Sequence, residues 1–343
     1  MSVDLAIGQR NTSARFIDMD RRRAASWAPA FGRRMVNRLV QSYVDAGARR
    51  GAALLRTDPH AFALLLAKWR AQAQRLEAAS LQHGSVGAVQ VAGPHYGLPS
   101  PPVPSDWFAP VRGEPRGFIV YVHGGSFVFD RSPALTELVM RFAAAAGSRV
   151  FAPNYRLAPE HPCPCAVEDI VEAFRWLRET WPDEPVVALS ESAGSSILLA
   201  ALQALRDQGE AMPDGVVLLS PWVDLSLQSW SVIATTLAGS TGSTVAALAL
   251  SAHLYLDGRL ATDPLASPLF GDFTGFPPVL IHASRGDPLF DDAVRLADRM
   301  RDAGTDLTVR LWVEDAHVFE KSASAKARES IDLAGDFIRR QLG

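Results

Sequence analysis

The chain has 343 residues, 48% of them hydrophobic, and a formal net charge of −3. This length and composition suffice for a packed core, and the charge gives no reason to expect nucleic acid or an acidic lipid surface as a partner. The first residues, MSVDLAIGQRNTSARF, lack the basic start and unbroken apolar run of a secretory signal. No segment reaches the roughly 18 consecutive apolar residues of a membrane span. We therefore expect a cytoplasmic protein with no membrane span.

Residues 1 to about 80 are rich in Ala, Leu and Arg and have no β-branched runs, which predicts helices. The stretch 58–79 has a helix start signal at Asp58-Pro59 and then apolar residues spaced for one helical face. A second segment, at 222–265, also contains helix-like pieces and no clear strand. We expect these two segments, about 1–80 and 222–265, to form a helical cap over the rest of the chain.

Outside these segments, apolar strands alternate with helices. The predicted strands lie at 86–93, 105–111, 117–123, 149–155, 185–190, 215–220, 277–284 and 306–313. The predicted helices lie at 133–146, 166–181, 193–206, about 291–303 and from about 322 onward. Such an alternation is typical of an α/β fold with a mostly parallel central sheet covered by helices on both faces. We predict a single domain over 1–343, with its core at about 86–221 and 266–343.

The strand at 306–313 is the last in the chain and is predicted to lie at the edge of the sheet. Unprotected edge strands pair readily with a second copy of the same chain. This reasoning predicts a homodimer through that edge, and Arg310 with its neighbouring charges favours the monomeric alternative.

The only two cysteines are Cys163 and Cys165, which are too close in sequence to form a disulfide framework. Together with His161 they resemble part of a metal site. No second cluster of Cys or His completes a tetrahedral ligand set, so we predict no metal. The two cysteines are interpreted as small residues that precede a helix.

A serine, an aspartate and a histidine follow the ends of three predicted strands. Ser192 lies at the apex of the strand–turn–helix stretch around SESAG, Asp287 follows the strand 277–284, and His317 follows the last strand. Reactive groups of α/β sheets gather beyond the carboxyl ends of the strands. Because a hydroxyl nucleophile needs a base, and the base needs an anion, we predict Ser192 as nucleophile, His317 as base and Asp287 as acid. Asp291 and Asp292 are alternatives for the acid, but both fall inside the next predicted helix.

The stretch HGGS at 123–126 follows the strand 117–123. Glycines there let backbone N–H groups approach a substrate oxygen. We predict that the N–H groups of Gly124, Gly125 and Ala193 form an oxyanion hole. His123 is interpreted as a structural residue that positions this loop.

These motifs together resemble the hormone-sensitive-lipase-like (GDxG) branch of the α/β-hydrolase esterases. The resemblance covers about residues 90–340 and rests on HGGS (123–126), NYRLAPEHPCPCAVED (154–169), SESAGS (190–195), SPWVDL (220–225), DPLFDDA (287–293) and HVF (317–319). It implies the α/β-hydrolase fold with a helical cap, an acyl-ester hydrolase without a cofactor, and the triad and oxyanion residues named above. The chain departs from the family pattern at Ser190 and Ser126, where glycine is usual, and at Glu191, where aspartate is frequent.

The function predicted from these residues is that of a serine carboxylesterase acting on small to medium acyl esters through an acyl-enzyme. The Trp, Phe, Leu and Ala content of the cap segments predicts an apolar substrate pocket. An amidase or a lactone hydrolase would use the same residues and stays an alternative. A non-catalytic ligand receptor on the same fold is disfavoured, because the nucleophile, acid and base are all present.

Overall fold

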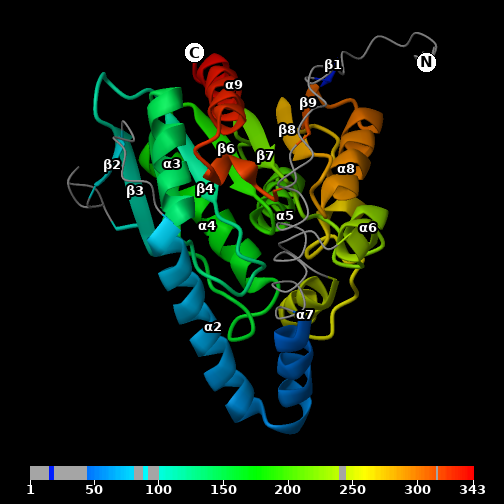
Figure 1. Ribbon diagram of the computed structural model, residues 1–343. Helices are drawn as coiled ribbons and strands as arrows, with labels where there is room; N and C mark the ends of the chain where they lie inside the picture. Colours follow the sequence, from blue (N-terminus) through cyan, green and yellow to red (C-terminus); the bar gives the residue numbers. More distant parts are fainter. Residues whose placement is uncertain (1–14, 19–44, 81–87, 92–99, 239–244, 314–315) are drawn as a thin grey trace.

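The computed structural model describes residues 15–18, 45–80, 88–91, 100–238, 245–313 and 316–343 (Figure 1). Within these residues, one sheet has the strand order β1-β9-β8-β7-β6-β4-β5-β3-β2. Its strands are β1 (Arg15–Asp18), β2 (Ala88–Val91), β3 (Ser105–Pro110), β4 (Phe118–Val122), β5 (Arg149–Pro153), β6 (Val186–Glu191), β7 (Gly215–Leu219), β8 (Val279–Ser284) and β9 (Leu307–Trp312). Two of its strand pairs are antiparallel, β2 with β3 and β3 with β5, and the other pairs are parallel. The prediction of a mostly parallel central sheet is confirmed.

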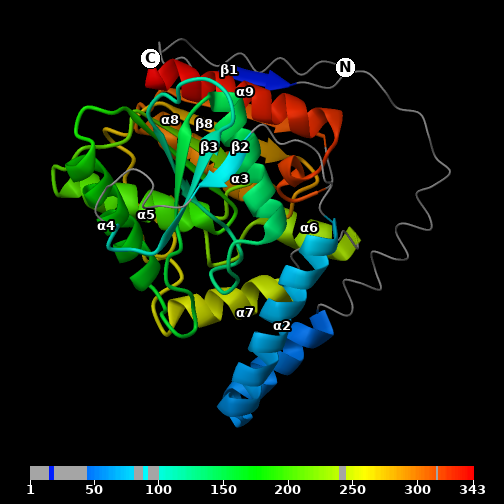
Figure 2. The same ribbon diagram turned by 90° about the vertical axis from the view of Figure 1, so that its left-hand side faces the viewer.

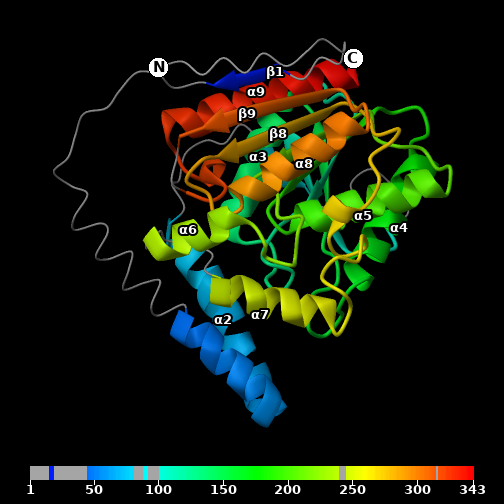
Figure 3. The ribbon, with the colours of Figure 1, turned by 90° about the vertical axis from the view of Figure 1, so that its right-hand side faces the viewer.

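Helices cover both faces of this sheet (Figures 2 and 3). They are α3 (Pro133–Ala146), α4 (Cys165–Thr180), α5 (Gly194–Asp207), α8 (Phe290–Asp302) and α9 (Ala325–Leu342). Alternate side chains of β4 serve the two faces: Ile119 and Tyr121 share a hydrophobic cluster with α3 and α9, whereas Val120 and Val122 pack in the cluster of α4, α5 and α8. Both clusters are apolar, which is why the strands read as unbroken hydrophobic runs.

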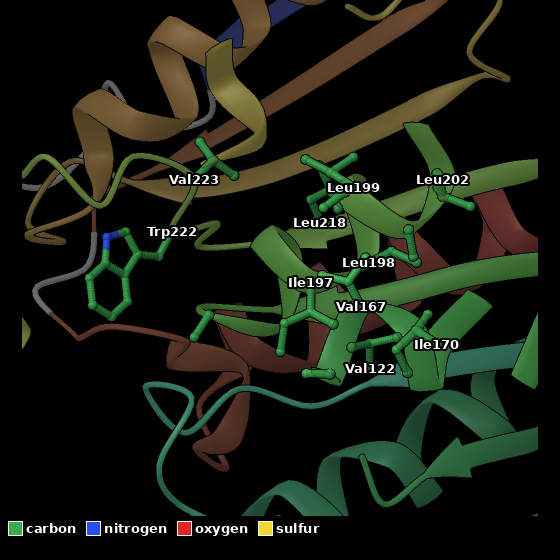
Figure 4. Packing of buried hydrophobic residues seen from close by; sticks show 14 of the residues in the cluster. Val122, Val167, Ile170, Ile197, Leu198, Leu199, Leu202, Leu218, Trp222 and Val223 are labelled. Carbon is green, nitrogen blue, oxygen red and sulfur yellow. The ribbon is translucent and has the colours of Figure 1, made fainter. Parts of the chain in front are cut away.

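Helix α5 is the most deeply buried of the helices around the central strands. Ile197, Leu198, Leu199 and Leu202 are each fully buried, and Figure 4 shows them packed beside residues of β4, β7 and α4. Burying one such side chain contributes about 1.5–3 kcal/mol. This packing fixes the N-terminus of α5, and with it the turn that joins β6 to α5.

The two predicted cap segments are largely helical where the structure describes them. Residues 45–57 and α2 (Pro59–Ser80) form a helical hairpin that projects from the sheet domain (Figures 1 and 2). The segment 222–265 contains α6 (Trp230–Ala238) and α7 (Val245–Leu256). The expectation of helices throughout 1–80 is wrong at Arg15–Asp18, where the chain pairs with β9 as strand β1. Residues 1–14 and 19–44 lie outside the described part.

The position of β9 differs from the sequence prediction. β1 pairs with β9 in parallel, from Arg15 opposite Thr308 to Asp18 opposite Leu311, so β9 is not an edge strand (Figure 3). The predicted homodimer through β9 therefore lacks the free edge on which it was argued. Among the helices of the described residues, none is both long and apolar enough to cross a membrane. The cytoplasmic location stays a prediction.

Candidate active site

Ser192 occupies the sharp turn between β6 and α5. Its backbone has a φ of 53°, in the left-handed region, and its N–H donates to the carbonyl of Leu219 at 3.0 Å. Gly194 follows where the turn passes close to the strand β4: a Cβ there would lie 2.3 Å from the carbonyl oxygen of Val122. The strained serine and the close approach at Gly194 give the geometry of a nucleophile elbow.

Ser190, two residues before the apex, lies inside β6 and is fully buried. Its Oγ is 3.0 Å from the Oγ of Ser195 in α5, so its hydroxyl is engaged with another serine hydroxyl. The structure thus accommodates a small side chain at this position, where the resemblance stated above led us to expect glycine.

The structure brings Ser192, His317 and Asp287 together from three separate loops. The Nε2 atom of His317 lies 2.8 Å from Ser192 Oγ, and its Nδ1 atom lies 2.9 Å from Oδ2 and 3.0 Å from Oδ1 of Asp287. Asp287 is buried, and its Oδ1 also accepts the N–H of Leu289 at 2.8 Å. The aspartate therefore fixes the imidazole with Nδ1 protonated, which leaves Nε2 free to accept the proton of the Ser192 hydroxyl.

The two alternative acids have other partners. Asp291 accepts the N–H of Ser231 at 2.9 Å. Asp292 is buried and accepts the N–H groups of Val223 and Asp224, both at 3.0 Å. Burial raises the pKa of Asp292 to about 6. Both carboxyls thus anchor the chain after β7 to α8, and Asp287 alone of the three contacts His317.

The loop after β4 has a different internal arrangement from the one expected. The N–H of Gly124 donates to Oε1 of Glu191, the residue before Ser192, so it is not available to a substrate oxygen. A Cβ at Gly124 would lie 2.4 Å from the Glu191 carboxylate. Burial raises the pKa of Glu191, and the charge of Lys321 and the Gly124 N–H act in the opposite direction. Of the three predicted oxyanion donors, Gly125 and Ala193 remain.

The turn after β4 requires a glycine at position 125. Its φ is 112°, and a Cβ would lie 2.4 Å from the carbonyl oxygen of Phe129. Its own carbonyl accepts the N–H groups of Val128 and Phe129. This tight turn presents Gly125 and the next residue, Ser126, on the wall of the cavity that holds Ser192.

His123 contacts Gly124 and Tyr155. It is fully buried, its Nδ1 lies 2.6 Å from the carbonyl of Gly124, and its ring stacks on Tyr155 with centroids 4.3 Å apart. The hydroxyl of Tyr155 donates to the His123 carbonyl at 2.6 Å. Burial lowers the pKa of His123 to about 4, which keeps the ring neutral. These contacts agree with a structural role for His123 in holding the loop.

A cavity of about 610 Å³ opens onto the Ser192 and His317 side chains. Four of its lining residues come from α2, and the others from the end of β6, the start of α3, and the segments that follow β4, β5, β6 and β9. They are Arg70, Ala71, Ala73, Gln74, Gly125, Ser126, Phe129, Asp130, Ser132, Leu135, Leu157, Glu191, Ser192, His317, Val318 and Lys321. The expected apolar lining is therefore mixed with polar side chains, and the described residues of 222–265 contribute none of it.

Comparison with known proteins assigns the family. The family described as alpha/beta hydrolase fold matches residues 119–321. An acetyl-hydrolase of Streptomyces hygroscopicus is 38% identical over 242 residues, covering 70% of this chain and 80% of the relative. The crystal structure of an esterase from the bacterial hormone-sensitive lipase family is 30% identical, with a TM-score of 0.73 over 88% of this chain and 98% of that chain. The chain belongs to this family of α/β-hydrolase esterases. A hormone-sensitive lipase from a metagenome library, 28% identical, gives a TM-score of 0.73 over 81% and 92%.

Arg70 makes most of the hydrogen bonds that connect helix α2 of the esterase to the sheet domain, and Gln74 adds one to the carbonyl of Arg131. Arg70 donates to both carboxylate oxygens of Glu160, at 2.7 and 2.9 Å, and to the carbonyls of Val128 and Ala158. These bonds connect α2 to the loop after β4 and to the loop after β5. Sequence reasoning did not find this contact, because an arginine on a helix face is most often solvated and nothing nearby in sequence marks its partners.

The cysteines of the esterase agree with their interpretation as small residues ahead of a helix. Cys163 is buried, with its Sγ 3.6 Å from the carbonyl of Leu265, and Cys165 begins α4. Burial raises the pKa of the Cys163 thiol to about 11. Within the described residues, no group of three or more His, Cys, Asp or Glu side chains is placed to hold a metal ion.

Proposed function

We propose that this chain is a serine carboxylesterase that hydrolyses small to medium acyl esters through an acyl-enzyme. One observation supports the proposal above all: the strained Ser192, on the wall of a cavity, lies 2.8 Å from His317 Nε2, while His317 Nδ1 lies 2.9 Å from the buried Asp287. A hydroxyl becomes a useful nucleophile when a positioned base removes its proton. The aspartate holds the tautomer that this base requires.

In the acylation step, Ser192 Oγ attacks the ester carbonyl carbon and its proton passes to His317 Nε2. Asp287 stabilises the imidazolium that results. The negative oxygen accepts hydrogen bonds from the backbone N–H groups of Gly125 and Ala193, and from that of Ser126, which follows Gly125 on the cavity wall. The bond from carbon to the alcohol oxygen then breaks, and the alcohol leaves with the proton from His317.

Deacylation repeats these roles with water. His317 takes a proton from the water molecule, whose oxygen attacks the acyl carbon of the ester on Ser192. The same N–H groups bind the second tetrahedral oxyanion. Collapse of this intermediate releases the carboxylic acid and returns the proton from His317 to Ser192 Oγ.

The acetyl-hydrolase from Streptomyces hygroscopicus supports a preference for acetyl and other short acyl groups. The cavity has room for more than an acetyl group, which agrees with a range from small to medium esters. Among the described residues, no contact favours amides or lactones over esters. The contacts among Ser192, His317 and Asp287 disfavour a receptor without catalytic activity.

A fluorophosphonate probe and an ester series test the proposal together. The parent protein is expected to bind the probe covalently and to hydrolyse p-nitrophenyl esters, fastest among the shorter acyl chains. Ser192→Ala should abolish labelling and lower kcat by about 10⁴–10⁶-fold. Ser190→Ala, which alters a neighbouring buried serine, serves as the matched control and should still be labelled. Labelling that persists in a folded Ser192→Ala protein would refute the assignment of the nucleophile.

A further inference from the structure

Directly after the His317 loop, three buried polar side chains from three different elements form a hydrogen-bonded chain. Glu320 lies in the single turn η3 (Phe319–Lys321), Ser330 in α9 and His282 in β8. Ser330 Oγ donates to Glu320 Oε1 at 2.8 Å, and His282 Nδ1 lies 2.8 Å from Ser330 Oγ. Ser330 has a single hydroxyl proton and donates it to Glu320, so its Oγ must accept the hydrogen bond from His282, whose Nδ1 therefore carries a proton.

Burial of these three groups is nearly complete: His282 and Ser330 have an exposure of 0% and Glu320 of 1%. Moving polar groups out of water is unfavourable unless their bonds are replaced, and here the replacement is only partial. Glu320 Oε2 and His282 Nε2 have no hydrogen-bond partner among the described residues. Such a costly arrangement beside a reactive site calls for a functional reason.

The turn that contains Glu320 is continuous with the loop that carries His317. Val318, between them, has a φ of 48°, and its N–H donates to Ser220 Oγ at 3.3 Å. The N–H of Lys321 donates to the carbonyl of Val318 at 3.1 Å. From the other side, Arg141 of α3 donates to the Glu320 carbonyl at 2.7 Å. A displacement of Glu320 would therefore be transmitted to His317 within one turn.

Burial, more than the surrounding charges, favours the neutral form of the Glu320 carboxyl below about pH 7. Burial raises the pKa of Glu320 to about 7, with Asp287 acting in the same direction and His317 in the opposite one. Burial and the nearby Arg310 lower the pKa of His282 to about 3. Arg141 is the other cation that interacts with the Glu320 charge. Below about pH 7, the hydrogen-bonded groups of His282, Ser330 and Glu320 are therefore all uncharged.

We propose that Glu320 is a positioning residue for the catalytic base: bonded through Ser330 to His282, it fixes η3 against β8 and α9 and so sets the His317 imidazole against Ser192. The inference rests on the proposed function, because its kinetic test measures kcat for ester hydrolysis. It assigns no contact with substrate to Glu320, since the side chain is buried and does not line the cavity at Ser192. Misplacing a catalytic group by about 1 Å can lower the rate a hundredfold.

The test compares three variants. Ser330→Ala removes the hydroxyl that connects Glu320 to His282, and alanine suits helix α9. We expect kcat to fall about 10–100-fold. KM should stay within about twofold, because the cavity is unchanged. Glu320→Gln keeps the acceptor Oε1 and should keep kcat within about threefold below pH 7. Ser148→Ala is the matched control, since Ser148 is equally buried and its Oγ bonds the carbonyl of Arg116, remote from η3. It should leave kcat unchanged.

Two readouts separate positioning from a loss of stability. The ratio of kcat between Glu320→Gln and the parent should change with pH around a midpoint near 7, because the carboxyl at position 320 titrates in the parent and is absent from the variant, whereas all other groups are common to both. The downfield proton resonance of His317 Nδ1–H, assigned with a His317→Gln protein, should shift in Ser330→Ala at temperatures where the fold is intact. Unchanged kcat and an unshifted resonance in a folded Ser330→Ala protein, or a ratio that is flat with pH, would overturn the inference. If the parent itself fails to react with a fluorophosphonate, the proposed function fails, and the resonance still decides the positioning role.

Discussion

Replacing Glu191 tests the arrangement of the loop from Gly124 to Ser126, the proposed oxyanion loop. Its Oε1 accepts the N–H of Gly124, and the hydroxyl of Tyr121 donates to the same oxygen at 3.3 Å. In Glu191→Ala both donors lose their partner inside the protein. In Glu191→Gln the amide oxygen still accepts from both, and only the negative charge is lost.

The expected magnitudes follow from these two bonds. A buried donor without a partner costs about 1–3 kcal/mol, so Glu191→Ala should lower the free energy of unfolding by about 2–6 kcal/mol. The loop from Gly124 to Ser126 would lose the bond that holds its first residue. Displacing one oxyanion donor typically lowers kcat about 10²–10³-fold, and we expect a loss of that size. Glu191→Gln should retain kcat within about threefold.

The assay combines urea unfolding with steady-state hydrolysis of p-nitrophenyl acetate. Tyr121→Phe is the matched control: it removes the second donor to Glu191 while the Gly124 bond remains, and should cost about 1 kcal/mol with little change in kcat. The decisive comparison is between the alanine and phenylalanine variants. If a folded Glu191→Ala protein keeps kcat within about threefold of the parent, the Glu191 bond does not organise the oxyanion loop.

Three further predictions concern single positions. Ser190→Gly should keep kcat within a few-fold and lower the free energy of unfolding by about 1–2 kcal/mol, because it loses the bond to Ser195 and gains backbone freedom. Ser190→Val should lower the free energy of unfolding by about 1–3 kcal/mol through overpacking and should also lower kcat. Urea unfolding and ester hydrolysis measure these effects, and an inactive, folded Ser190→Gly protein would contradict them. Gly194→Ala should destroy activity or folding, because its Cβ would lie 2.3 Å from a backbone oxygen; normal kcat and circular dichroism would disprove it. Burial lowers the pKa of His282 to about 3. Below about pH 6.5, His282 is therefore protonated in the unfolded state but not in the folded state, and the free energy of unfolding decreases as the pH falls. His282→Gln should therefore reduce the slope of unfolding free energy against pH by about 1.4 kcal/mol per unit between about pH 4.5 and 6, and equal slopes in parent and variant would refute the reasoning.

Local signals allowed most helices and strands of the sheet domain to be predicted. Helix α3 begins and ends where the sequence indicated, because Ser132 caps it, Pro133 starts it and Gly147 ends it in the left-handed conformation. Strand β1 was missed since four residues acquire strand structure only by pairing with β9, far along the chain. The edge assignment of β9 failed for the same reason. A pattern within a short window does not record such distant pairing.

The site was predictable to the extent that its residues follow strands in order. Ser192, Asp287 and His317 come together because parallel strands end at one edge of the sheet. The bond from Gly124 to Glu191 was not predictable, since a glycine after a strand reads the same whether its N–H faces a substrate or a buried carboxyl. Glu320 was missed for a related reason: an isolated glutamate carries no sequence signal of burial.

Backbone strain gathers on the loops that form the site, and this links the nucleophile to the base. Ser126, Ser192, Ser220 and Val318 all have positive φ values, between 45° and 54°, on the loops after β4, β6, β7 and β9. Each such residue costs about 1–3 kcal/mol unless its surroundings hold it. Hydrogen bonds to the end of β7 and to the residue after it hold two of them. The N–H of Ser192 donates to the carbonyl of Leu219, and the N–H of Val318, next to His317, donates to Ser220 Oγ. The loop after β7 therefore holds both the turn of Ser192 and the turn of His317, so the distance between the proposed nucleophile and the proposed base depends on a loop that contributes neither of them.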